Sequence, residues 1–296
     1  MRYISRIILL VLCMTLLLIT GCVANAVIYE TTSRNLENQE NTEEPVIVDT
    51  EGSGTVYSQK WSGLGMCLGG VDDINQFNTD VDTLLANGFT QIRVHLSPYT
   101  ESGWQTLSKA AVLSAISKGA DVIWGVTGGA GPLTADDWVD YRVEILAAAQ
   151  WAQDNGVYEF QIGNEEEMHN DDTTLTDTQL IANLKSVATE VQAIFTNGNV
   201  SYSFGGVGIN TWLTTGKGDI DILATNLYMG GHGYYDDWWK TLITKMVNAF
   251  GTDGIYLTEF GPSWSSLNDY STDEAVQAKA ISEMINYIIS SSSFPN

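Results

Sequence analysis

From Trp61 onward, short apolar runs rich in β-branched residues alternate with longer segments in which apolar residues recur at helical spacing. This alternation is typical of repeated βα units, whose strands form one parallel sheet covered by helices. We expect seven strands, at residues 63–68, 91–96, 121–126, 159–163, 201–204, 222–227 and 255–259. Helices are predicted at residues 80–87, 104–118, 138–155, 178–196, 210–215, 235–250 and 273–290.

The length of these units limits the topology. About 30 residues per unit, in a domain of about 250 residues, is typical of the α/β fold known as the (β/α)8 TIM barrel. A doubly wound sheet is disfavoured because no Gly-x-Gly-x-x-Gly follows the first expected strand. Because little sequence follows residue 290, we expect a TIM barrel that is truncated before strand eight.

The first 54 residues are expected to lie outside the barrel. Two arginines precede an apolar stretch at 7–19 that is too short to span a bilayer, so residues 1–21 are predicted to be a signal peptide. Its end, Leu-Ile-Thr-Gly-Cys, resembles a bacterial lipobox, and the resemblance implies lipidation of Cys22; the alternative is an ordinary secretory signal. Residues 22–54 are rich in Asn, Glu and Thr and predict a flexible tether. We therefore expect an extracytoplasmic domain at 55–296, lipid-anchored to the cell membrane or envelope surface.

The charge of the chain excludes one class of partner. The sequence has 36 acidic and 13 basic residues, for a formal net charge of −23. Because binding a polyanion requires clustered Lys and Arg, no nucleic acid partner is expected. The histidines show no metal-ligand spacing, so neither a metal nor another cofactor is expected.

Two glutamates stand where a TIM barrel carries its chemistry. Asn164 and Glu165 directly follow the strand at 159–163, and Glu259 ends the strand at 255–259. The carboxyl ends of barrel strands meet at one rim, so both carboxyl groups are expected there. Glycoside hydrolysis needs such a pair, because one group protonates the leaving oxygen while the other attacks the anomeric carbon.

An Asn-Glu dyad after the fourth strand, with a glutamate at the end of the seventh, resembles the clan A retaining glycoside hydrolases, in particular family 5. The resemblance implies that Glu165 is the general acid/base and Glu259 the nucleophile. It further implies that Asn164 contacts the sugar 2-hydroxyl, that Arg93 supports the nucleophile and that Tyr228 hydrogen-bonds it.

Some positions depart from the family 5 pattern. Glu166 and Glu167 stand where proline often follows the dyad, and both are expected to face solvent. Asn226 stands where a histidine usually precedes the strand-six tyrosine, and it is kept as a substrate-binding candidate. The tryptophan that ends strand eight in the family is absent together with that strand.

Three further side chains are candidates for contact with a sugar. Trp264 lies in the loop after Glu259 and is the first candidate for an aromatic platform under a sugar ring, with Trp124 second. His95 follows Arg93 by two residues, and it is expected either to line the mouth of the barrel or to be a satisfied core histidine.

The expected activity is hydrolysis of O-glycosyl bonds in a β-linked poly- or oligosaccharide, of the β-glucan or β-mannan type. Three alternatives remain open. A cell-surface glycan-binding barrel would lack catalysis, and a transglycosylase would use the same glutamate pair with a sugar hydroxyl in place of water. A substrate-binding lipoprotein of a transporter would need two lobes, and the sequence shows no second lobe.

Overall fold

The computed structural model describes residues 64–68, 73–94, 96–100, 102–129, 133–168, 175–229, 238–251 and 254–262, with Ser282 and Tyr287 as single positions. All of them belong to the unit Ser62–Asn296. The expected signal peptide, Cys22 and the tether lie outside the described residues, as do His95 and Trp264. These expectations stay predictions.

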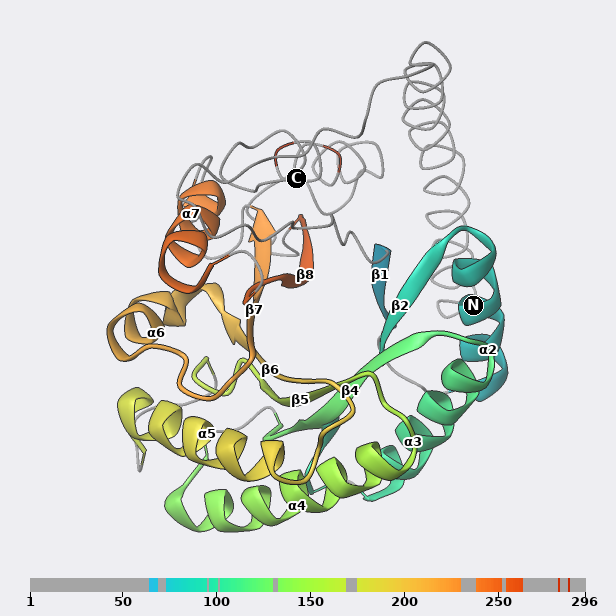
Figure 1. The fold of residues 1–296 in the computed structure, drawn as a ribbon, viewed down its shortest axis with the longest axis horizontal. Coiled ribbons are helices and arrows are strands. Elements are labelled where there is room, and N and C mark those ends of the chain that lie inside the picture. Colours follow the sequence, from blue (N-terminus) through green and yellow to red (C-terminus); the bar gives the residue numbers. More distant parts are fainter. Residues whose placement is uncertain are drawn as a thin grey trace, which may run out of the picture. The chain divides into compact units, whose positions relative to one another are not determined.

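A parallel sheet forms the centre of this unit (Figure 1). Its strands pair in the order β1-β2-β4-β5-β6-β7-β8, and a short strand, β3, pairs with β4. The strands are β1 Leu64–Leu68, β2 Phe89–Val94, β3 Ser97–Pro98, β4 Asp121–Thr127, β5 Glu159–Asn164, β6 Asn199–Gly205, β7 Ile222–Met229 and β8 Leu257–Pro262. The seven expected strands are confirmed within three residues at each end, whereas β3 was not expected. No strand among the described residues pairs β8 with β1.

Helices follow most strands and lie outside the curl of the sheet (Figure 1). They are α2 Ile74–Ala86, α3 Ser102–Ser117, α4 Ala135–Asp154, α5 Asp177–Gln192, α6 Ile209–Thr215 and α7 Trp238–Phe250. Helix α2 begins before residue 80, where the sequence placed it, because the Asp73 side chain accepts hydrogen bonds from the Asn75 and Gln76 amides. Thr134 and Thr176 begin α4 and α5 with capping boxes. No helix among the described residues is long and apolar enough to cross a membrane.

The outward face of the sheet forms the hydrophobic core with the helices. Alternate residues of β4, β5 and β6 are buried there, namely Val122, Trp124, Phe160, Ile162, Tyr202 and Phe204. Trp124 packs edge-on against Trp151 and Phe160, and its Nε1 donates a hydrogen bond to Ser108 Oγ at 2.6 Å. The prediction of Trp124 as a sugar platform is therefore wrong, because its ring is fully buried in this core.

The opposite face of the sheet is polar. Buried polar side chains project from β2, β5, β6 and β7, namely Arg93, Glu159, Gln161, Ser201, Ser203 and Asn226. Such groups remain buried only when they have partners. The hydrogen bonds of Arg93, Gln161, Ser203 and Asn226 form one network that includes Asn164 at the carboxyl end of β5, where the candidate site lies.

Candidate active site

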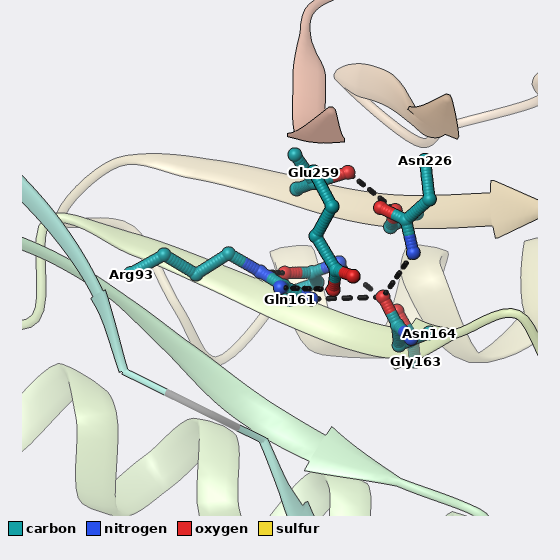
Figure 2. A network of polar contacts seen from close by, with 8 residues as sticks. Arg93, Gln161, Gly163, Asn164, Asn226 and Glu259 are labelled. Carbon is teal, nitrogen blue, oxygen red and sulfur yellow. Dashed lines mark hydrogen bonds and ion pairs between the residues drawn. The ribbon is translucent and has the colours of Figure 1, made fainter. Parts of the chain in front are cut away.

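Arg93 on β2 connects residues of β5 and β8 on the polar face of the sheet (Figure 2). Its Nη1 donates a hydrogen bond to Glu259 Oε1 on β8, and its Nη2 donates one to Asn164 Oδ1 at the end of β5, each at 2.8 Å. Its Nε donates to Gln161 Oε1 at 2.9 Å. Each of the three guanidinium nitrogens therefore donates a hydrogen bond, and together these bonds fix the orientation of the guanidinium group.

In the ion pair between Arg93 and Glu259, the arginine is buried and the glutamate is partly exposed. The Arg93 side chain is 5% exposed and the Glu259 side chain 25% exposed. A buried cation needs an anionic partner, and Glu259 forms an ion pair with it. The carboxyl group of Glu259 thus has a fixed orientation while it stays accessible to a ligand at the rim.

The amide of Asn164 is oriented by two donors. Its Oδ1 accepts from Arg93 Nη2 and also from Asn226 Nδ2, the latter at 3.2 Å (Figure 2). Asn226 Oδ1 in turn accepts from Ser203 Oγ at 3.0 Å. Because both donors hold Oδ1, Asn164 presents its Nδ2 as the group available for donating to a ligand.

Glu165 follows Asn164 in a backbone conformation that is uncommon for a residue with a side chain. Its φ is +60°, and no other non-glycine residue described by the structure has a positive φ. Such a conformation costs on the order of 1–3 kcal/mol and persists where surrounding contacts impose it. The Glu165 amide donates to Ser203 O at 2.8 Å, and its carbonyl accepts from the Met168 amide at 2.8 Å. A Cβ placed on Gly205 would lie 3.5 Å from Glu165 Oε1, so this carboxyl group lies against the end of β6.

Glu166 is buried, with 2% of its surface exposed, so the expectation that it faces solvent is wrong. Its Oε1 accepts hydrogen bonds from Thr127 Oγ1 and the Gly128 amide at 2.9 Å, and from the Asn164 amide and Tyr141 Oη at 3.1 Å. Burial raises the pKa of Glu166, while these donors act in the opposite direction.

Glu167 is also buried rather than solvent-facing. Its Oε1 accepts from the Gly205 amide at 2.7 Å, and its Oε2 accepts from Tyr202 Oη. The same Tyr202 oxygen accepts from the Glu166 amide at 3.0 Å. Burial raises the pKa of Glu167 to about 8, and the nearby Glu165 carboxylate adds to the shift.

The remaining predicted site residues are placed only in part. Tyr228 lies on β7 with its backbone in register with Gly261 of β8, and its side chain lies outside the described part of the chain. Over the described residues, no group of three or more His, Cys, Asp or Glu side chains is placed to hold a metal ion.

No protein-family model and no curated protein matches this sequence. Solved structures do resemble it. A GH113 β-1,4-mannanase superposes with a TM-score of 0.56 at 15% identity, over 78% of this chain and 85% of that one. Another structure, a complex of a GH113 β-1,4-mannanase, gives 0.54 at 16% identity, over 74% and 79%. A Bacteroides uniformis β-glucuronidase gives 0.58 at 16% identity, over 78% of this chain but only 29% of that one.

The resemblance establishes the architecture. The chain has the α/β fold of TIM-barrel glycoside hydrolases, with parallel strands that curl inside a layer of helices (Figure 1). The polar cluster around Arg93 reaches the carboxyl end of β5 at Asn164, on the side of the sheet at which TIM barrels carry out their chemistry.

Proposed function

We propose that this protein is a retaining glycoside hydrolase that cleaves β-linked polysaccharides, with Glu259 as nucleophile and Glu165 as general acid/base. The observation that carries the proposal is the Arg93 guanidinium, which binds Glu259 from β8 and the residue preceding Glu165 on β5. A structural ion pair would need neither a rim position nor a carboxylate still open to solvent. A nucleophile needs both.

The reaction proceeds in two displacements. In the first, Glu259 attacks the anomeric carbon while Glu165 gives its proton to the glycosidic oxygen, the bond between carbon and oxygen breaks, and a glycosyl ester forms on Glu259. In the second, the Glu165 carboxylate takes a proton from water, whose oxygen attacks the anomeric carbon and releases Glu259. Each displacement inverts the configuration of the anomeric carbon, so the product retains the configuration of the substrate. A sugar hydroxyl in place of water would make the same site a transglycosylase.

Neighbouring side chains have distinct roles in this proposal. Arg93 holds the attacking carboxylate in place, and Asn164 directs its Nδ2 toward the sugar 2-hydroxyl, whose hydrogen bonds strengthen in the transition state. Asn226 fixes the Asn164 amide through Oδ1. Tyr228 remains a proposed hydrogen-bond donor to Glu259 at the substrate-binding site, and Trp264 and His95 remain proposed substrate contacts, on the grounds given by the sequence.

The substrate proposed for the first assays is β-1,4-mannan, followed by β-glucans. Support for mannan comes from the shared fold with GH113 β-1,4-mannanases, which this chain covers over most of their length. The polysaccharide would be met outside the cytoplasm, since we propose that Cys22 carries a lipid anchor. A Cys22→Ser variant that remains membrane-bound would contradict the anchor.

The experiment compares Glu259→Ala and Glu165→Ala on mannan and on aryl β-mannosides. Glu259→Ala should abolish cleavage of every substrate. Glu165→Ala should still cleave 2,4-dinitrophenyl glycosides, which need no protonation of the leaving group, and added azide should speed this reaction. Glu190→Gln, which breaks an exposed ion pair with Arg142, serves as the control and should retain activity. Equal and complete loss in both alanine variants would contradict the assigned roles.

A further inference from the structure

The turn that presents Glu165 is held between two buried carboxyl groups, those of Glu166 and Glu167. We infer that these two glutamates are positioning residues, which together hold Glu165 in its left-handed backbone conformation and aim its carboxyl group at the glycosidic oxygen. The inference rests on the proposed function, because it assigns a task to Glu165.

Glu166 attaches one side of the turn to β4 and α4. Its Oε1 binds Thr127 and Gly128 at the end of β4, together with the Tyr141 hydroxyl from α4. The same oxygen accepts the Asn164 amide, so the chain is held immediately before Glu165. The fit is close, because a Cβ on Gly128 would lie 2.5 Å from Glu166 Oε2.

Glu167 attaches the other side of the turn to β6. Its two oxygens accept from the Gly205 amide and the Tyr202 hydroxyl. This contact is also close, since a Cβ on Gly208 would lie 2.9 Å from Glu167 Oε1. Tyr202 couples the two sides, because its oxygen also accepts the Glu166 amide. Glu165 therefore lies between segments anchored to β4 and to β6.

The chemistry of these contacts requires a carboxyl group at position 167. Both oxygens of Glu167 act as acceptors toward donors on β6. A Gln side chain has the same shape, but its NH2 group cannot accept the hydrogen bond that the Tyr202 hydroxyl donates to Oε2, so Tyr202 would have to turn its hydrogen away and accept from the amide instead. Glu167→Gln thus preserves packing and reverses the hydrogen bond to Tyr202, whose oxygen already accepts from the Glu166 amide. Tyr202→Phe removes the hydroxyl that joins both sides, also with little change in volume.

The test measures kcat/KM of the full chain on phenyl and 2,4-dinitrophenyl β-mannobiosides, or on the matching β-cellobiosides if wild type prefers glucan. Misdirection of the acid slows only reactions that need a proton on the leaving group. We expect Glu167→Gln and Tyr202→Phe to lower kcat/KM on the phenyl substrate about 100-fold, and on the dinitrophenyl substrate less than about 5-fold. A general loss of structure would lower both equally.

Glu159→Gln is the matched control, because Glu159 is a buried carboxyl group on β5, the strand that precedes this turn, at the end away from the turn. Glu159→Gln should change kcat/KM on the phenyl and the dinitrophenyl substrate by the same factor. Equal losses on both substrates in Glu167→Gln and Tyr202→Phe would overturn the inference and leave the proposed function intact. If wild type cleaves no glycoside, the proposed function fails and the inference fails with it. If Glu167→Gln does not fold, the ratio of kcat/KM on the two substrates in Tyr202→Phe alone tests the inference.

Discussion

The Nη1 of Arg93 lies 2.8 Å from Oε1 of Glu259, and the two residues are 166 positions apart in the sequence. This ion pair joins β2 to β8 across the face of the sheet (Figure 2). It can form only once the intervening strands are in place. Folding of the sheet therefore also orients the carboxyl group of Glu259, the proposed nucleophile.

Arg93→Lys should lower kcat/KM at least about 100-fold, the usual effect of removing one well-aimed polar contact from a catalytic site. Lysine cannot reproduce the three directed hydrogen bonds of the guanidinium, so Glu259 and Asn164 lose their common donor. The free energy of unfolding should also fall, by less than the roughly 3–5 kcal/mol of a fully buried pair, because Glu259 is partly exposed. Steady-state kinetics and urea denaturation measure both effects.

Arg142→Lys provides the comparison for that variant. Arg142 pairs with Glu190 on the surface, where solvent screens an ion pair and leaves it little effect on stability. Kinetics and stability should stay close to wild type. A fully active Arg93→Lys variant would show that the guanidinium fork has no role in catalysis.

The stability of the protein should decrease from pH 5 to pH 8. Burial raises the pKa of Glu159 to about 7 and that of Glu167 to about 8, whereas an unfolded Glu titrates near 4.3. Between these values the folded state binds more protons than the unfolded state. The free energy of unfolding therefore falls as pH rises, by up to about 1.4 kcal/mol per pH unit for each group. Urea denaturation at each pH measures this slope.

Glu159→Gln should flatten that pH dependence, because an amide cannot titrate. Asp140→Asn, at an exposed position on α4, should leave the slope as in wild type. A wild-type stability that rises steadily from pH 5 to pH 8 would contradict the protonation of these buried glutamates.

Gly125→Ala should prevent folding into a soluble protein. Gly125 on β4 is in register with Gln161 on β5, and a Cβ there would lie 1.7 Å from the Gln161 backbone oxygen. The strands would have to separate, because a backbone atom cannot swing aside. In contrast, Gly103→Ala in α3 meets nothing within 4 Å and should fold normally. Soluble yield and circular dichroism separate the two outcomes, and a stable Gly125→Ala variant would refute the close approach.

The strands were predictable because their signal is local. Runs such as that of β4 combine β-branched and aromatic residues between polar segments, and a buried parallel strand needs little else. The residues Arg93, Asn164, Asn226 and Glu259 were also found from the sequence, and the structure brings them together in one network. Asn164 ends β5 as expected, whereas Glu259 was expected to end its strand and instead lies within β8, which continues to Pro262.

The burial of Glu166 and Glu167 was not predictable in the same way. Two consecutive carboxyl groups are normally exposed, and only partners distant in sequence reverse that preference. The partners here are Thr127, Tyr141 and Tyr202, which reach the turn from three other elements. The one available signal was the position of the pair, one residue after a strand whose first five residues are buried.

Covalent trapping of Glu259 tests the proposed mechanism most directly. A 2-deoxy-2-fluoro β-glycoside with a good leaving group slows the second displacement and lets the glycosyl-enzyme accumulate. Mass spectrometry of the intact protein should show the addition of one fluorosugar, and peptide mapping should place it on Glu259. A label on another residue, or cleavage of the substrate with inversion at the anomeric carbon, would contradict Glu259 as the nucleophile.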